Sequence, residues 1–348
     1  MGGKMKKICC RYLKKRNRRK MGIWILLCVL LLTGCSQSIS GREAGQEDWD
    51  TPEAAVPESL APMPETTEEG SAQRILAGLI KDEGFRDCVW YEADIDNQDT
   101  EEQILHKLNQ CEELILKKTD GGSELHSLEA LSYLPNLKIL VIDFDSWNGS
   151  GVADFTPIAG LSGLKELSIE NSAKEEMDLS FLAEMKQITE LYLPNCRVEE
   201  MEFLKDMPQL ERLSLYETEV EDLAVLENLQ GLVELALSGN SHARNMEIVG
   251  KLGSLQDLGL QNCGIRDIGF VSKLTELRSL NLNTNFITDL APLTGLTKLE
   301  RLGLAENQIR DISPLESLTN LYDLALDRNE ISDISVLSGL AYLNQAGF

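Results

Sequence analysis

The sequence predicts an α/β solenoid in which short parallel strands line a concave face. Two observations lead to this fold class. A leucine pattern recurs ten times between residues 109 and 340, at intervals of 22 to 27 residues. Aromatic residues make up only 5% of the chain, so branched aliphatic residues must fill most of its core. Self-similarity at such a period is typical of stacked repeats, in which each unit covers the apolar face of its neighbour.

The first 34 residues are basic and then apolar. They contain ten Lys and Arg residues and no acidic residue, and the stretch MGIWILLCVLLLT at 21–33 is apolar. This order is typical of a secretory signal peptide. An apolar helix of 13 residues rises about 20 Å, short of the roughly 30 Å core of a bilayer. A signal peptide over residues 1–34 is therefore favoured over a stable transmembrane anchor.

The sequence Leu32-Thr33-Gly34-Cys35 closes this segment and resembles the lipobox of bacterial lipoprotein signal peptides. The resemblance implies cleavage before Cys35 and a diacylglycerol group on its thiol. Two acyl chains bind a membrane stably, whereas one chain binds only marginally. The resemblance thus implies a protein anchored at the extracytoplasmic face of the cell membrane. An ordinary signal peptide with an incidental cysteine is the alternative.

Residues 35–70 form the next segment, which begins at the lipidated cysteine. It is rich in proline and acidic residues, and its apolar residues are too scattered to build a core. This composition predicts a disordered, self-repelling linker. Such a linker would hold the rest of the chain away from the membrane.

Residues 71–108 are predicted to form a helical N-terminal cap. The stretch RILAGLI at 74–80 has the apolar spacing of a helix. Thr100 and Gln103 stand in a capping-box arrangement ahead of Ile104, Leu105 and Leu108, which indicates a second helix. These helices would cover the first repeat.

Ten repeats follow over residues 109–340, starting at 109, 135, 162, 186, 208, 230, 253, 275, 297 and 319. Their third, sixth and eighth places hold Leu or Ile in 29 of 30 cases, with Cys111 as the exception. The sixth and eighth places lie on one side of a strand, and strands joined by such short connections stack in parallel. In residues 341–348 the same places hold Leu343, Ala346 and Phe348, which indicates a partial repeat or a C-terminal cap.

The repeated pattern LxxLxLxxNxIxDIxPLxxL resembles the 22-residue leucine-rich repeats of internalin-like bacterial surface proteins. The resemblance covers about two thirds of the chain. It implies a leucine-rich repeat horseshoe with a parallel concave β-sheet and short helical turns on the convex side. It also implies a cell-surface binding protein, with adhesion to host cells among the functions of such proteins.

The eleventh place of each repeat carries a short side chain: Thr119, Asp145, Ser172, Cys196, Thr218, Asn240, Cys263, Asn285, Asn307 and Asn329. Such groups can bond backbone atoms that become buried where the chain leaves each strand. Cys196 and Cys263 are therefore structural, and at roughly 14 Å they are too far apart for a disulfide. Asp289, Asp311 and Asp333 are expected to cap the helical turns.

Fifth-place and seventh-place side chains point outward from the concave face and have no role in the core. Large side chains concentrate in the N-terminal half, where aromatic groups at these or neighbouring places offer contact area at little entropic cost. Acidic groups beside them favour a basic ligand. The predicted ligand-binding residues are Tyr192, Tyr216, Phe144, Trp147, Glu166, Glu190, Glu234 and Asp257. The alternative for Phe144 and Trp147 is that both pack beneath the insertion DSWNGSGVADF of their own repeat.

The sequence indicates neither catalysis nor a cofactor. His106, His126 and His242 lie outside any HExxH, GxSxG or P-loop motif. The acidic loop at 94–99 lacks the glycine and the final glutamate of a calcium-binding EF-hand, so we expect no metal site. Beyond residue 34 the chain holds 23 basic and 57 acidic residues, a balance that repels nucleic acid.

These features together predict a monomeric, membrane-anchored surface protein that is not an enzyme. Its concave face would bind another protein, of basic character, or another macromolecule. The alternative is the recognition arm of a larger surface enzyme or cell-wall protein whose C-terminal part is missing from this sequence.

Overall fold

The structure is a computed structural model that describes residues 71–118, 122–147, 151–171, 176–198, 200–343 and 345–347. The predicted signal peptide, the predicted lipidation site Cys35 and the predicted linker lie outside these residues. Thr119 and Ser172 of the eleventh-place set do so as well. In the described part, no helix is long and apolar enough to cross a membrane.

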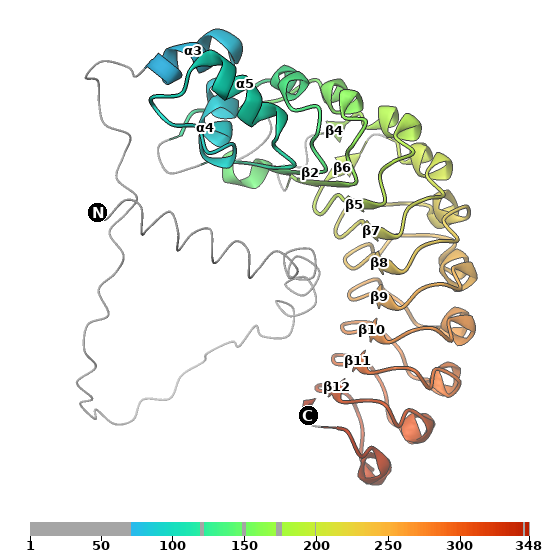
Figure 1. Ribbon diagram of the computed structural model, residues 1–348. Helices are drawn as coiled ribbons and strands as arrows, with labels where there is room; N and C mark the ends of the chain where they lie inside the picture. The colour runs from blue at the N-terminus through green and yellow to red at the C-terminus, as the bar shows by residue number, and fades with distance from the viewer. Residues whose placement is uncertain are drawn as a thin grey trace, which may run out of the picture. The chain divides into compact units, whose positions relative to one another are not determined.

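One parallel sheet of 11 strands runs through the described repeats, with its strands in chain order (Figure 1). The strands are β1 (Glu113–Lys117), β2 (Ile139–Asp143), β3 (Glu166–Glu170), β5 (Glu190–Tyr192), β7 (Arg212–Ser214), β8 (Glu234–Ala236), β9 (Asp257–Gly259), β10 (Ser279–Asn281), β11 (Arg301–Gly303), β12 (Asp323–Ala325) and β13 (Gln345–Gly347). Fifth places pair with fifth places throughout, as Glu113 with Ile139 and Glu190 with Arg212. The predicted strand phase is therefore confirmed, including the strand in residues 341–348.

Short 3-10 helices form the side of the solenoid opposite the sheet, as Figure 1 shows. They are η1 (Glu129–Tyr133), η3 (Thr156–Gly160), η4 (Ser180–Glu184), η5 (Glu202–Asp206), η6 (Leu223–Leu226), η7 (Met246–Lys251), η8 (Gly269–Lys273), η9 (Ala291–Leu293), η10 (Ser313–Ser317) and η11 (Ser335–Gly339). Asp289, Asp311 and Asp333 each accept a hydrogen bond, at 2.8 to 2.9 Å, from the backbone N–H two residues later. These aspartates thus bond the first N–H of each helical turn from the place before its N-cap residue, and the N-cap residues themselves make no side-chain capping bond.

A continuous core of leucine and isoleucine separates the sheet from these helices. The sixth-place and eighth-place residues are buried in every complete repeat, as Leu280 and Leu282 illustrate. Parallel strands with one apolar and one polar side require this alternation, because successive side chains point to opposite faces. Each repeat thus contributes one layer, and contact with the next layer stabilises it.

Eleventh-place asparagines hold successive repeats together. The Nδ2 of Asn285 donates to the backbone oxygens of Leu260 and Leu282, both at 2.9 Å. Its Oδ1 accepts from the backbone N–H groups of Cys263 and Ile265 at 3.1 and 2.9 Å. Asn240, Asn307 and Asn329 make equivalent bonds. The predicted satisfaction of buried backbone groups within and between repeats is confirmed for these residues.

The two eleventh-place cysteines are buried thiols. The Sγ of Cys196 lies 3.1 Å from the backbone oxygen of Ile169, and that of Cys263 lies 3.3 Å from that of Leu237. Burial raises the pKa of the Cys263 thiol to about 11 and that of Cys196 further. Because the thiolate is the reactive form, both cysteines are structural, as predicted.

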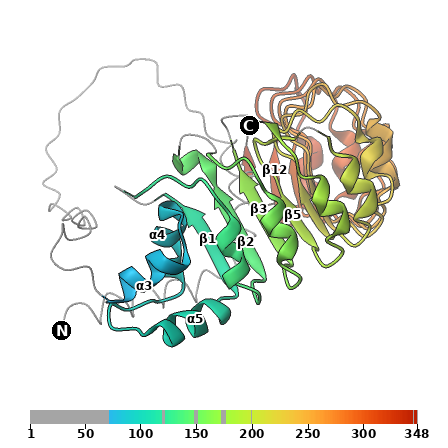
Figure 2. The same cartoon turned by 90° about the horizontal axis from the view of Figure 1, so that it is seen from above.

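Three helices cover the first strand: α3 (Ser71–Leu79), α4 (Glu83–Glu92) and α5 (Glu101–Asn109). Figure 2 shows them at the β1 end of the sheet, where α4 packs against β1. The capping box is present, with Thr100 Oγ1 accepting from Gln103 N–H and Gln103 Oε1 from Thr100 N–H. Helix α4 was not predicted, because its short apolar stripe of Phe85, Cys88 and Val89 is interrupted by charged residues.

Candidate ligand-binding face

The concave face is the side of the sheet formed by fifth-place and seventh-place side chains of β1–β12. Along β1, the inward Leu114 and Leu116 are fully buried, whereas the outward Glu113 and Ile115 are half-buried. The same alternation holds on β2, β11 and β12, whereas the seventh-place residues from β3 to β10 are buried. The partly exposed part of this face is therefore formed by the fifth places and by the seventh places at its two ends.

A network of four side chains crosses β5, β7 and β8. The Tyr192 hydroxyl donates to Glu190 Oε2 at 3.0 Å. Arg212 pairs with Glu190 through Nη1 at 2.7 Å and with Glu234 through Nε at 3.1 Å. Although burial opposes the charge on Arg212, the carboxylates of Glu234 and Glu190 outweigh that effect and raise the pKa of the guanidinium. Glu190 and Glu234 thus share one counter-ion supplied by the protein itself.

A second ion pair lies further along the face. Arg301 Nη2 on β11 contacts Asp257 Oδ1 on β9 at 3.0 Å. The pair spans β10, whose fifth place holds the small residue Ser279, and Ser279 is buried. Burial raises the pKa of Asp257, and the Arg301 guanidinium opposes that rise.

Glu166 on β3 differs from these acidic residues. It is half-buried, and no hydrogen bond or ion pair joins its carboxylate to any side chain in the described part of the chain. Burial raises its pKa to about 7, with further contributions from Glu190 and Glu113, while Arg212 acts in the opposite direction. Among the described residues, the fold therefore holds this carboxylate on the concave face without an ion-pair partner.

Three of the predicted aromatic anchors are buried, which corrects the prediction that they are exposed. Phe144 is 0%, Trp147 6% and Tyr192 2% exposed. Phe144 packs against Trp147 and Phe155, with ring centroids 6.2 and 6.0 Å away, and Trp147 Nε1 donates to Ser123 O at 3.2 Å. Phe155 closes the insertion of the second repeat, so the alternative interpretation, packing beneath that insertion, is correct for Phe144 and Trp147.

Tyr192 does lie on the concave face, but its neighbours cover it. In register beside it are Ser168 and Ser214, which are also buried. Tyr192 therefore serves as a hydrogen-bond donor to Glu190 rather than as an exposed anchor. Tyr216 is half-buried, and its pKa is raised to about 12, first by burial and then by Glu217.

An apolar cluster on β1 and β2 was missing from the predicted site residues. Ile115, Ile139 and Val141 are half-buried on the concave face and do not pack against the leucine core. Ile115 pairs in register with Val141. Three β-branched residues at outward places of two consecutive repeats were the available sequence signal.

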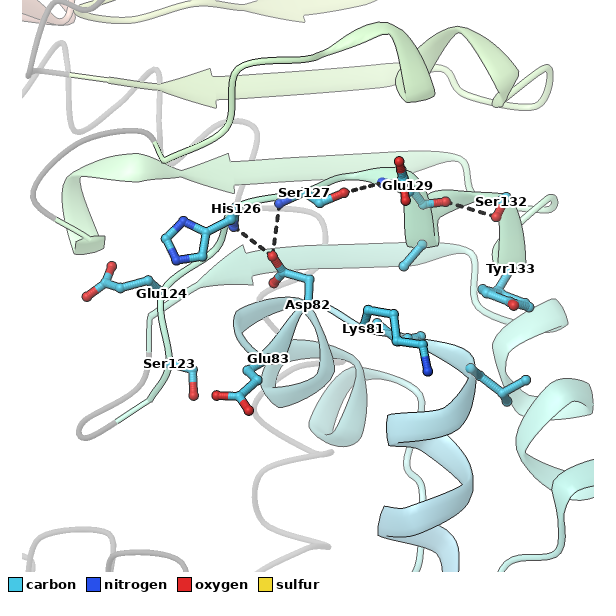
Figure 3. A pocket seen from close by; sticks show the side chains of 13 residues that line it. Lys81, Asp82, Glu83, Ser123, Glu124, His126, Ser127, Glu129, Ser132 and Tyr133 are labelled. Atoms are coloured by element: carbon cyan, nitrogen blue, oxygen red, sulfur yellow. Dashed lines mark hydrogen bonds between the residues drawn. The ribbon is translucent and has the colours of Figure 1, made fainter.

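A separate hollow of about 890 Å³ lies between the N-terminal cap and the loop that follows β1 (Figure 3). Asp82 stands at its centre and accepts hydrogen bonds from the backbone N–H groups of Phe85, His126 and Ser127. A Cβ on Gly84 would lie 2.5 Å from the backbone oxygen of Glu124, so this close approach requires glycine. These contacts join the cap to the first repeat, and Asp82 is fully occupied by them.

Metal binding finds no support in the part of the chain that the structure describes. Within it, no group of three or more His, Cys, Asp and Glu side chains could hold a metal ion. Asp99 is engaged instead with the backbone N–H of Asp96 and with Lys107, at 2.6 and 2.5 Å.

Comparisons with known proteins agree with this architecture. The family pattern described as Leucine Rich repeats (2 copies) matches residues 254–295 and 297–339. Among solved structures, the functional domain of InlJ from Listeria monocytogenes is 15% identical, with a TM-score of 0.56 over 78% of this chain and 61% of that one. No curated protein matches the sequence.

Two further internalins of Listeria monocytogenes are also similar. InlF is 21% identical, with a TM-score of 0.49 over 78% of this chain and 97% of that one. InlC2 is 24% identical, with a TM-score of 0.40 over 78% and 95% of the two chains. The sheet and helices described above, the family pattern and the likeness to the InlJ domain show that the fold of this chain is a leucine-rich repeat solenoid. Solenoids of this kind typically use their concave surface to bind other proteins.

Proposed function

We propose that this chain is a binding protein that contacts a protein partner through the concave face of its leucine-rich repeats. The observation that carries the proposal is that the fifth-place side chains of β1 to β12, apart from the buried Ser279, stay partly exposed on one sheet face, outside the leucine core. Six fifth-place residues on this face are acidic and two are basic. Such a balance favours a partner with basic side chains, chiefly because it speeds the encounter.

Capture of partners by the full chain tests this proposal. Val141→Arg/Ala325→Arg places two large cations on the concave face, one in each half, at half-buried positions. Its matched control, Ser272→Arg/Ser338→Arg, places two cations at exposed positions of η8 and η11 on the opposite side. We expect the first variant to lose the partners that the wild type captures and the control to keep them. Unchanged capture by the concave-face variant, at an unchanged melting temperature, would rule the proposal out.

The location of the protein is a second part of the proposal. The order of a basic segment, an apolar segment and LTGC at 32–35 supports attachment through lipid on Cys35, at the extracytoplasmic face of the cell membrane. The proline-rich acidic stretch that follows would act as a spacer between the lipid and the solenoid. Labelled palmitate is expected to enter the wild type and to be absent from Cys35→Ser. Label that persists in Cys35→Ser would show that attachment occurs elsewhere.

A further inference from the structure

The apolar cluster of Ile115, Ile139 and Val141 sets the β1–β2 part of the concave face apart from the rest. The seventh places further along the sheet hold Gly259, Asn281, Gly303 and Ala325. Aliphatic side chains that face solvent in a contiguous group mark an interaction surface more often than isolated ones do. Since these three residues do not pack against the leucine core, the fold itself gives no reason for their apolar character.

Carboxylates without counter-ions border this cluster. In register, Ile139 lies between Glu113 on β1 and Glu166 on β3. The two fifth places are therefore about 10 Å apart, at two strand spacings. No ion pair or hydrogen bond reaches the side chain of Glu113 or Glu166 within the described residues.

Neighbouring acidic residues do have cations supplied by the protein itself. Arg212 serves Glu190 and Glu234, and Arg301 serves Asp257. On β1 and β2 themselves, Lys117 pairs with Asp143 at 3.9 Å, but among the described residues no cation pairs with Glu113 or Glu166 beside the apolar cluster. Charge and apolar character at β1–β3 are complementary to a segment that carries both a cation and aliphatic groups.

We infer that the β1–β3 part of the concave face takes a protein segment that presents a Lys or Arg side chain to Glu166 and Glu113 and aliphatic side chains to Ile115, Ile139 and Val141. The inference rests on the proposed function. It adds the chemistry of the partner and the part of the concave face that the partner contacts. Burial of Glu166 fits it, because a half-buried carboxylate gains more from an added cation than an exposed one does.

Three synthetic peptides of equal length test the inference with the full chain: one of alternating Lys and Leu, one of Lys and Ser, and one of Glu and Leu. Each carries a dye, and binding is followed by fluorescence anisotropy. We expect the Lys/Leu peptide to bind at least about tenfold more tightly than the other two. Equal binding of the Lys/Ser peptide would reduce the interaction to general charge attraction and overturn the inference, as would no binding of the Lys/Leu peptide.

Matched variants locate the contact. Glu166→Gln should weaken binding of the Lys/Leu peptide about fivefold or more, and Val141→Ser should weaken it as well. The control is Asp323→Asn, which removes a half-buried fifth-place carboxylate of β12 that makes no ion pair in the described part. It should change affinity less than twofold. Equal weakening by Glu166→Gln and Asp323→Asn, with melting temperatures unchanged, would contradict the assigned place.

Failure of this inference is distinguishable from failure of the proposed function. If Ala325→Arg alone abolishes partner capture while Val141→Arg alone does not, the concave face binds but the β1–β3 assignment is wrong. If neither substitution affects capture, the proposed function itself is wrong.

Discussion

Individual residues at the eleventh place illustrate how one side chain can hold two repeats. Asn285 both donates to and accepts from buried backbone groups of its own and the preceding repeat. Asparagine alone among the residues seen at this place offers two amide protons and a carbonyl oxygen in one short side chain. Cys263 can only donate weakly, so the two residues share a position without being equivalent.

Replacement of Asn285 by alanine should therefore be costly. It leaves the backbone oxygen of Leu260 and two backbone N–H groups unsatisfied in the core, while Leu282 O keeps its bond from Asn307, and we expect a loss of about 3 kcal/mol or more in the free energy of unfolding. The comparison variant Cys263→Ala removes one weak donor and should cost about 1 to 2 kcal/mol. Urea unfolding of the two variants measures both values, and similar losses would contradict the proposed difference.

Glu166 gives a pH-dependent prediction at the same scale. Its pKa in the folded protein is raised to about 7, mainly by burial and also by Glu190 and Glu113, against Arg212. Because the pKa of Glu166 is higher in the folded protein than its ordinary value of 4.5, the fold favours the protonated carboxyl. The stability that protonated Glu166 contributes is fully present below pH 4.5 and is lost as the pH rises through about 7. Glu166→Gln removes this loss. At pH about 8 the variant should be more stable than the wild type by about 1 to 2 kcal/mol, after allowance for solvent screening, and the difference should shrink toward pH about 5.

Denaturant unfolding at both pH values provides the measurement. A stability difference that stays constant with pH would mean that the Glu166 carboxyl is not perturbed by the fold. Because this is an unfolding measurement, it tests the environment of Glu166 without a partner. The proposed partner contact depends on the same residue.

Backbone conformation at Thr284 offers a stabilising substitution. Its φ of 56° lies in the left-handed region, which is unfavourable for a β-branched residue. The equivalent residues Asn195 and Asn262 adopt φ of 59° and 53° with a side chain that tolerates this region. Thr284→Asn keeps the backbone bond from residue 284 to Ala305 O and should raise stability by about 0.5 to 1 kcal/mol. A loss of stability would show that the Thr284 hydroxyl contributes more than its backbone strain costs.

At the scale of one element, the 3-10 helices depend on their neighbours more than on their own sequence. Ile312 precedes η10 and is 2% exposed, whereas its equivalent Ile334 precedes η11 and is 53% exposed. The local sequences, DISPL at 311–315 and DISVL at 333–337, are nearly the same. The difference arises because described residues cover Ile312 on both sides along the solenoid and Ile334 on one side only.

Alanine substitutions at these two positions should differ accordingly. Ile312→Ala removes a fully packed side chain and should cost about 2 to 5 kcal/mol, while Ile334→Ala should cost less than about 1 kcal/mol. Thermal or urea unfolding measures the two losses. A large loss at Ile334 would mean that this side chain is covered in solution.

On the scale of the whole molecule, acidic charge dominates: the chain carries 57 acidic and 33 basic residues. The concave face shares this excess but arranges it unevenly, with paired acids from β5 to β11 and the uncompensated Glu113 and Glu166 toward β1. Salt should therefore affect encounter with a basic ligand more than it affects the folded structure. We expect the association rate of the Lys/Leu peptide to fall several-fold between about 0.05 and about 0.5 M salt. Stopped-flow anisotropy measures this rate, and an insensitive rate would exclude electrostatic steering.

Leucine spacing did not predict the short pair β4 (Glu176–Met177) and β6 (Arg197–Val198), but it was sufficient to place every strand of the 11-stranded sheet, its register and the side that faces the core. The reason is that the side-chain period of a strand is two and each repeat must bury its leucines against the next, so a single phase satisfies all copies. The eleventh-place bonds and the aspartate caps followed from the same phase. Helix α4 did not, since its few apolar residues acquire a core only by packing against β1.

Contacts between repeats decide which outward side chains are available for binding. Tyr192 is buried and bonds Glu190 two residues away, Phe144 packs against Phe155 and Trp147, and Trp147 bonds the backbone of Ser123. Glu190, Glu234 and Glu166 look alike in the sequence, yet only the first two lie within reach of Arg212. Burial and ion pairing depend on the size and charge of residues one repeat away, so local pattern places a side chain on the face but does not determine whether it is free.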